Sequence, residues 1–272
     1  MRVRTLFVVL LMSLGTPTLA RATWSIVAVD QSSLEVGVAA ASCIGGVDIV
    51  VGLVPGHGAV AAQAFANLDA RDEATRLLAA GTPPSEVVER ITSADFDPEA
   101  WYSQWWSGMG IRQYGVVGLG GTPSAVSFTG ELTVEWSGAL QGEEVAVQGN
   151  MIRANVVASA LRAFESAEGC ALPDRLMIAL EAGAEAGGDR RCSPSLGSLS
   201  AVLAVARPGD TPDRPHLRLS VDVDPGFGML LSLYRLYRPY SPAAMESPTT
   251  RLRAEYDAWR AEHLDAPICT RR

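Results

Sequence analysis

The sequence predicts an α+β fold in which two mainly antiparallel sheets are sandwiched between helical layers. Short segments of the 272-residue chain show the apolar runs and alternation typical of strands, whereas longer segments repeat apolar residues with the 3.6-residue period of helices. Strands followed by helices occur in three successive blocks. This order favours two packed sheets that helices cover.

The first block begins with a hairpin, because residues 30–33 have turn composition and separate two buried apolar segments. Gly81 ends the first expected helix, and Pro83 and Pro84 precede the second. The strands expected in this block are residues 24–29, 34–41 and 58–64, and the helices are residues 70–80 and the segment from residue 85.

The second and third blocks are divided by Gly and Pro in the same way. The strands expected there are residues 112–117, 125–129, 132–136, 144–148, 199–206 and 217–223. The expected helices are residues 151–168, 174–186, 227–237 and 250–263.

An aromatic-rich loop, residues 95–110, separates the first two blocks and carries Trp101, Tyr102, Trp105 and Trp106. So many aromatic side chains suggest a pocket rim, or a homo-oligomer contact through the stretch from Trp101 to Trp106. Packing of these side chains over the core is an equally good interpretation.

The first 22 residues have the three parts of a secretory signal: two early arginines, a short apolar run, and small residues ending in Ala20 and Ala22. The run is too short for a membrane span, which needs about 20 residues. We therefore expect an exported, periplasmic or secreted protein that is cleaved after Ala22, with cleavage after Ala20 as the competing site. The mature chain would be one domain, residues 23–240, with a helical extension, residues 241–272.

The charge of the chain is acidic. The net charge is -8, and removal of the signal, which carries three Arg and no acid, leaves 19 basic against 30 acidic residues, a mature charge of -11. This charge argues against nucleic acid or an anionic membrane as a partner. All 22 basic residues are Arg, so no Lys is present to act as a catalytic base or Schiff-base residue.

Four cysteines accompany the signal, and an oxidising compartment favours disulfides. Cys170 and Cys192 flank a predicted helix and its loop, which favours that pair and leaves Cys43 with Cys269. The cysteine spacings resemble no metal site, and no metal or other cofactor is expected.

The common hydrolase motifs are absent from the sequence. It has no Gly-x-Ser-x-Gly elbow and no His-x-x-x-His or Cys-x-x-Cys pair. A Ser42/His57 pair remains an alternative hydrolase site, although nothing in the pattern singles it out.

Cleavage after Ala22 would leave Thr23 as the first residue of the first strand. An N-terminal threonine carries a hydroxyl nucleophile and an α-amine, with an unperturbed pKa of about 8, that can accept its proton. Thr23 would then be the catalytic residue. The alternative without catalysis is that Thr23 is only the first residue of a strand and that the signal is cleaved at another position.

Several blocks of this chain resemble, in order, those of the Ntn-hydrolase-like family catalogued as domain of unknown function 1028, whose cytoplasmic members start Met-Thr-Phe-Ser. They span about residues 23–223. The blocks are residues 23–28 (TWSIVA), 37–42 (GVAAAS), 63–67 (QAFAN), 112–115 (RQYG), 128–130 (FTG), 148–150 (QGN) and 187–191 (GGDRR).

The resemblance implies the four-layer αββα sandwich of N-terminal-nucleophile (Ntn) hydrolases, with Thr23 as the nucleophile. It supplies no substrate, because the family has no settled one. Two departures from the family pattern affect the expected pocket: His57 replaces an apolar residue, and residues 192–195 lengthen a loop.

Neutral polar residues within these blocks are candidates for the catalytic site. Ser42 ends the strand paired with the first and would orient the Thr23 amine, unless it only caps a turn. Gln63 and Asn67 suit an oxyanion hole or a substrate amide, although Asn67 is also placed to cap a helix. Asn150 is expected at a strand-to-helix junction, where backbone N–H groups converge on an oxyanion.

Charged and polar residues of the same blocks are candidates for substrate binding, and Gln148 lies beside Asn150. Asp189, Arg190 and Arg191 follow two glycines, and an Asp/Arg pair there is either buried, where it holds the electrostatics of the site or binds a substrate carboxylate, or a solvated loop pair. Arg112 has the same two interpretations. We expect a hydrolase of a small amide; the alternative class is a non-catalytic binding protein that holds its ligand with the aromatic loop.

Overall fold

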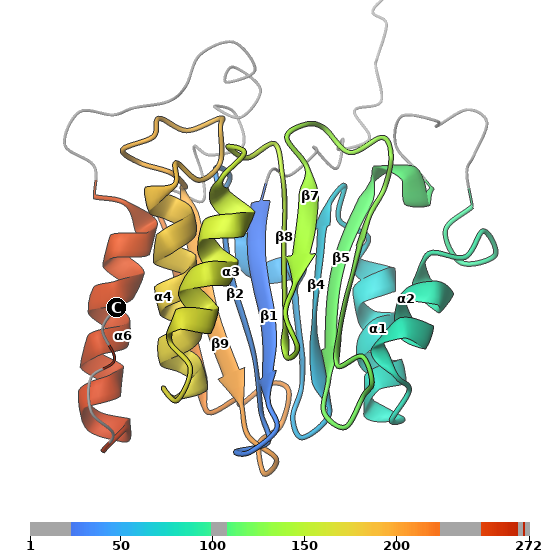
Figure 1. The fold of residues 1–272 in the computed structure, drawn as a ribbon, viewed down its shortest axis with the longest axis horizontal. Helices are drawn as coiled ribbons and strands as arrows, with labels where there is room; N and C mark the ends of the chain where they lie inside the picture. The colour runs from blue at the N-terminus through green and yellow to red at the C-terminus, as the bar shows by residue number, and fades with distance from the viewer. Residues whose placement is uncertain (1–22, 99–107, 224–245, 266–268, 270–272) are drawn as a thin grey trace, which may run out of the picture.

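The computed structural model describes residues 23–98, 108–223, 246–265 and 269. These residues form two antiparallel sheets and five α-helices, which confirms the predicted α+β class (Figure 1). The expected signal, the aromatic stretch from Trp101 to Trp106 and the expected helix at 227–237 lie outside the described residues.

The larger sheet has six strands in the order β10-β9-β2-β1-β8-β7. Its strands are β1 (Thr23–Asp30), β2 (Glu35–Ser42), β7 (Gly138–Gln141), β8 (Val145–Asn150), β9 (Ser200–Ala206) and β10 (Leu217–Asp222). β1 and β2 form the predicted hairpin at the centre of this sheet, with their turn at the bottom of Figure 1.

The smaller sheet has four strands in the order β3-β4-β5-β6. Its strands are β3 (Val51–Val54), β4 (Gly58–Ala64), β5 (Arg112–Gly118) and β6 (Ala125–Thr129), and the 3-10 helices are η1 (Val47–Val50) and η2 (Met109–Ile111). The two sheets face each other, and Val27, Val29, Ala61 and Val117 belong to one buried cluster between them.

Helices cover the outer face of each sheet. The helices are α1 (Leu68–Ala79), α2 (Pro84–Ile91), α3 (Val156–Ser166), α4 (Leu172–Glu185) and α6 (Pro248–His263). Trp24 and Ile26 of β1 pack with Leu176 and Leu180 of α4, whereas Tyr114 of β5 packs with Leu78 of α1. Burial of each large apolar side chain contributes about 1.5–3 kcal/mol, so these faces dominate the stability.

The last helix, α6, is fixed to the larger-sheet side by polar and covalent bonds. The guanidinium of Arg260 binds both carboxylate oxygens of the buried Asp174 on α4, and the Tyr256 hydroxyl donates to the same carboxylate at 2.8 Å. Beyond the helix, Cys269 forms a disulfide with Cys170.

The disulfide pairing predicted from the sequence is wrong. The bonds join Cys43 to Cys192 and Cys170 to Cys269. The prediction paired cysteines that flank one helix and its loop, but tertiary packing brings the end of β2 beside the loop that contains Cys192, 149 residues away in sequence.

Two of the predicted elements are also corrected. Residues 132–136 alternate apolar and polar residues but form turns, in which the Thr133 hydroxyl donates to the carbonyl of Gly130 at 2.7 Å and Leu132 is 61% exposed. The expected helix at 151–168 begins only at Val156, because the chain after β8 first pairs with the loop after α4, through a β-bridge of Ile152 with Asp189 and a bond from the Arg153 N–H to the carbonyl of Gly188. Strands β3 and β7 were not expected from the sequence.

Candidate active site

Polar residues replace the apolar core at one end of the space between the sheets. Alternate residues of a strand share one face, so Ser25 and Thr23 continue the face that begins with Val29 and Val27. We call this group the buried polar layer, and all its side chains are 0% or 1% exposed. Its members are Thr23, Ser25, Ser42, Gln63, Gln113, Gln148 and Asn150.

Thr23 is held on both sides by strand pairing. It lies opposite Ser42 of β2 and opposite Asn150 of β8, so the predicted neighbours Ser42 and Asn150 are both brought to it. In the 272-residue chain its nitrogen is joined to Ala22 in a peptide bond, and the residue is fully buried. Removal of the preceding residues is therefore required for an α-amine to exist here.

Gln63 reaches from β4 in the smaller sheet to the first residue of β1. Its Nε2 donates to the Thr23 carbonyl at 3.2 Å and to Gln113 Oε1 at 2.7 Å. Its Oε1 accepts a hydrogen bond from the Ser25 hydroxyl at 2.6 Å. Gln63 therefore connects the two sheets at the level of Thr23, and both protons of its amide are used in doing so.

Asn150 is connected to the same network through Gln113 of β5. Its Nδ2 donates to Gln113 Oε1 at 3.2 Å, and Gln113 Nε2 donates to the carbonyl of Gly149 at 2.9 Å. An amide nitrogen carries two protons, and among the described residues Asn150 Nδ2 makes only this bond. The second proton of the Asn150 amide therefore has no acceptor among the described residues.

Gln148 lies one layer deeper than Asn150. Its Nε2 donates to the Ser25 hydroxyl at 2.6 Å, while its buried Oε1 has no partner among the described residues. A β-carbon on Gly115 would lie 2.2 Å from this oxygen, so glycine is required where β5 passes the Gln148 side chain.

Ser42 connects Thr23 to a buried ion pair. The Arg191 guanidinium donates to the Ser42 hydroxyl at 3.3 Å and to Asp189 Oδ2 at 2.7 Å. Asp189 Oδ2 also accepts the backbone N–H of Cys43 at 2.6 Å. The Cys43–Cys192 disulfide joins the same two segments, so β2 and the loop after α4 are fixed to each other beside Thr23.

The buried Asp/Arg pair predicted after the two glycines exists, but Arg191 supplies its cation in place of Arg190. Arg190 is exposed and donates to the carbonyl of Glu135 at 2.8 Å. Arg153 lies nearby and donates to the carbonyl of Cys192 at 3.2 Å. Burial lowers the pKa of Arg153, and the charge of Arg190 lowers it further, whereas Asp189 opposes this shift.

Two predicted site residues have other contacts in the structure. Arg112 lies on the face of β5 opposite Gln113, where its guanidinium binds Asp97 at 2.8 Å and the carbonyl of Phe65 at 2.5 Å. The Asn67 side chain accepts the backbone N–H of Ala70 at 3.1 Å and caps α1. No described contact connects either residue to the buried polar layer.

His57 is not brought to Ser42. It precedes β4 in the turn after β3, whereas Gln63, at the other end of β4, contacts Thr23. Six residues of strand separate the two ends by about 20 Å. The His57 ring is exposed and its Nδ1 contacts the carbonyl of Pro55 at 3.0 Å.

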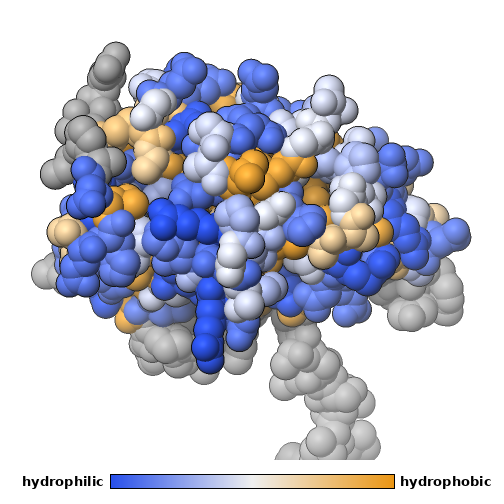
Figure 2. Space-filling model, turned by 90° about the horizontal axis from the view of Figure 1, so that it is seen from below, coloured by the Kyte–Doolittle hydropathy of each residue, from blue (hydrophilic) through white to orange (hydrophobic). Residues whose placement is uncertain are grey.

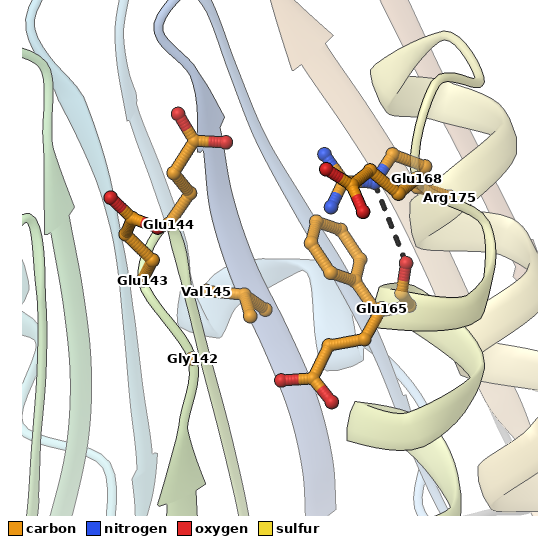
Figure 3. Close-up of a pocket in the computed structure, with 8 residues that line it drawn as sticks. Gly142, Glu143, Glu144, Val145, Glu165, Glu168 and Arg175 are labelled. Atoms are coloured by element: carbon orange, nitrogen blue, oxygen red, sulfur yellow. Dashed lines mark hydrogen bonds between the residues drawn. The ribbon is translucent and has the colours of Figure 1, made fainter.

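A cavity of about 350 Å³ lies at the other end of β1. Glu144, one of its lining residues, accepts the Val29 N–H through its carbonyl, near the turn that ends the strand. Figure 3 shows Glu143 and Glu144 facing Glu165, Glu168 and Arg175 across it, and Figure 2 shows mixed hydrophilic and small apolar patches on this end of the molecule. The length of β1 separates this acidic cavity from Thr23 by about 23 Å.

No group of three His, Cys, Asp or Glu side chains is arranged to hold a metal ion in the described part of the chain. None of the described helices combines the length and apolarity needed to cross a membrane.

Ser25 and Gln113 are site residues that the sequence did not single out, and of the two arginines after Asp189 it favoured Arg190. Ser25 and Gln148 stand two residues from Thr23 and Asn150, so the period of a strand would have placed them on the same face. Gln113 has no such signal, because only the pairing of β4 with β5 places it beside Gln63.

Comparisons with known proteins agree with this fold. A family model described as "Family of unknown function (DUF1028)" matches residues 23–226. The crystal structure of protein SPO2555 from Silicibacter pomeroyi, which has the same family model, is similar with a TM-score of 0.59 and 25% identity. The alignment covers 85% of this chain and 94% of that one. No curated protein matches the chain.

Proposed function

Because this chain belongs to the DUF1028 family, whose function is unknown, we propose on the geometry of its site that it is an Ntn-type hydrolase of a small amide. The nucleophile is Thr23, made N-terminal by removal of residues 1–22. The observation that carries the proposal is the position of Thr23: it is the first residue of β1, it pairs with β2 and β8, and the family match begins at this residue.

The arrangement of the layers supports this assignment. Helices α3 and α4 cover the larger sheet, and α1 and α2 cover the smaller one, as the αββα sandwich of Ntn hydrolases requires (Figure 1). A nucleophile at the start of a central strand is held rigidly, because neighbouring strands fix its backbone on both sides.

The proposed reaction uses the two functional groups of one residue. The neutral α-amine of Thr23 accepts the hydroxyl proton, directly or through one water, as Oγ1 attacks the amide carbonyl carbon. The tetrahedral oxyanion accepts a hydrogen bond from Asn150 Nδ2. The C–N bond then breaks, the leaving amine takes the proton from the Thr23 ammonium, and water hydrolyses the acyl ester to release the acid and restore Thr23.

The other polar residues have supporting roles in this proposal. Ser42, held by Arg191, orients the amine of Thr23 from the opposite strand. Gln63 holds the Thr23 carbonyl and does not donate to the oxyanion, because both of its amide protons are already bonded. Gln148, Asp189 and the arginines near it are the remaining groups from which substrate contacts would come.

We propose that export activates the enzyme, because removal of residues 1–22 creates the α-amine of Thr23. The signal-like residues 1–22 and the two disulfides are consistent with an oxidising compartment outside the cytoplasm. Export thus both delivers the protein and activates it.

The test is covalent labelling of the exported protein with a β-lactone probe. Intact mass gives the mature N-terminus, and peptide mapping locates the acylated residue. We expect a chain that begins at Thr23 and carries one acyl group on it. A mature chain that begins at Arg21, or labelling that persists in Thr23→Ala, contradicts the proposal.

A further inference from the structure

The hydrogen bonds of the buried polar layer follow a fixed direction that starts at the Thr23 carbonyl. A carbonyl oxygen only accepts, so the group of Gln63 that faces it at 3.2 Å must be the NH2. The Gln63 oxygen consequently faces Ser25. The Ser25 hydroxyl, 2.6 Å away, must therefore donate its single proton to Gln63.

The direction of the Ser25 proton also fixes the orientation of the Gln148 amide. Because the only Ser25 proton points to Gln63, Gln148 must present its NH2 to Ser25 Oγ, which it does at 2.6 Å. This choice leaves Gln148 Oε1 buried without a partner among the described residues, an unfavourable state for a polar atom. The orientation of Gln148 is therefore set by Ser25.

Gln113 fixes the other side of Gln63. Gln113 Oε1 accepts from both Gln63 Nε2 at 2.7 Å and Asn150 Nδ2 at 3.2 Å. Its Nε2 meanwhile donates to the carbonyl of Gly149 at 2.9 Å. Every contact of Gln63 is thus consistent with a single orientation of its amide.

From these hydrogen-bond directions we infer that Ser25 is the positioning residue of the proposed active site. Its hydroxyl holds the Gln63 amide in the orientation that binds the Thr23 carbonyl. The inference rests on the proposed function of Thr23. Once residues 1–22 are gone, Thr23 has no covalent neighbour on its amino side, and the Gln63 bond restrains the carbonyl of the nucleophilic residue. Without the Ser25 hydroxyl, the buried Gln63 Oε1 loses the only donor it has among the described residues, and an unsatisfied buried oxygen weakens the hold of the Gln63 amide on the Thr23 carbonyl.

The test compares the mature wild-type protein with Ser25→Ala in two measurements. In the first, the rate at which a β-lactone probe acylates Thr23 is measured over a range of probe concentrations. This gives two separate quantities, the acylation rate at saturating probe and the probe concentration at half-saturation. We expect Ser25→Ala to lower the saturating rate about 100-fold, the loss typical of a misplaced reacting group, with the half-saturating concentration changed less than about twofold.

The second measurement does not depend on catalysis. In a protein labelled with ¹⁵N, hydrogen exchange of the Gln63 side-chain NH2 reports whether its two hydrogen bonds are kept. We expect slow exchange in the wild type and faster exchange, by about tenfold or more, in Ser25→Ala. Ser25→Thr, which keeps the hydroxyl, should restore both the rate and the protection.

Ser124→Ala is the matched control. The Ser124 side chain is also buried and donates one hydrogen bond, to the carbonyl of Glu143 at 2.6 Å, but it has no described contact with Gln63. It should change neither measurement. If Ser25→Ala does not fold, Ser25→Cys keeps the volume with a weak donor, and the same losses in smaller degree are expected.

The outcomes separate the two proposals. If the probe labels no Thr23 but Ser25→Ala still releases the Gln63 amide, the proposed chemistry fails and the orienting role of Ser25 stands. If the Gln63 amide stays protected in Ser25→Ala, or if protection is lost and Thr23 still reacts at the wild-type rate, Ser25 is not the positioning residue.

Discussion

Thr23 lies opposite Asn150 in the antiparallel pairing of β1 with β8, and the Asn150 amide donates to Gln113 Oε1 at 3.2 Å. The first residue of the domain thus faces an oriented amide that is supported by the smaller sheet.

The first prediction concerns the nucleophile. In the mature protein, Thr23→Ala should reduce β-lactone labelling and any amide hydrolysis by about 10³-fold or more, because the attacking oxygen is lost. Thr23→Ser keeps the hydroxyl and should retain reactivity within about tenfold. Equal activity of Thr23→Ala and the wild type, measured on one substrate, would rule out this mechanism.

The second prediction concerns the amine as base. Its unperturbed pKa is about 8, and only the neutral form accepts the hydroxyl proton. The labelling rate should therefore rise about tenfold per pH unit below that value and level off above it. A chain that retains Ala22 has an amide nitrogen instead and should show no such rise and little labelling. Measuring the labelling rate against pH for the mature chain and for the chain that retains Ala22 tests whether the amine is the base.

The third prediction compares the two disulfides. In the chain-entropy model, closing a loop of 99 or 149 residues contributes about 5 kcal/mol to the free energy of unfolding. Replacing either pair by serines should thus lower stability similarly in urea unfolding. Loss of Cys43–Cys192 should also slow labelling of Thr23, because this bond fixes Ser42 to the loop of Asp189 and Arg191. Loss of Cys170–Cys269 should leave labelling unchanged.

The fourth prediction concerns the attachment of α6. Asp174→Ala removes the buried carboxylate that both the Arg260 guanidinium and the Tyr256 hydroxyl bind, and should cost about 3–5 kcal/mol of unfolding free energy. Glu181→Ala removes the partly exposed pair with Arg253, also between α4 and α6, and should cost about 0–1 kcal/mol. Similar losses in the two variants, measured by urea unfolding, would mean that burial of the pair is not what matters.

The sequence by itself determined the order of the strands and helices in most of the chain, and it singled out Thr23. Apolar alternation and Gly and Pro signals are local, so the hairpin of β1 and β2 and helices α1, α2 and α4 could be predicted from short segments. The same local signal misled at residues 132–136, where the alternating residues form turns that belong to neither sheet. Local signals also could not show that β8 continues through Asn150, because that strand is extended by its pairing with β1.

Only the tertiary structure decided which polar residues meet Thr23. Gln63 and Gln113 come from the opposite sheet, Arg191 from a loop 149 residues beyond Ser42, and the disulfides from chain segments that no spacing relates. Arg112 and Arg190 have the same chemistry as Arg191 but lie on another strand face and on the surface. Side-chain type is written in the sequence, whereas the contacts of a side chain depend on sheet pairing and strand face, which non-local packing fixes.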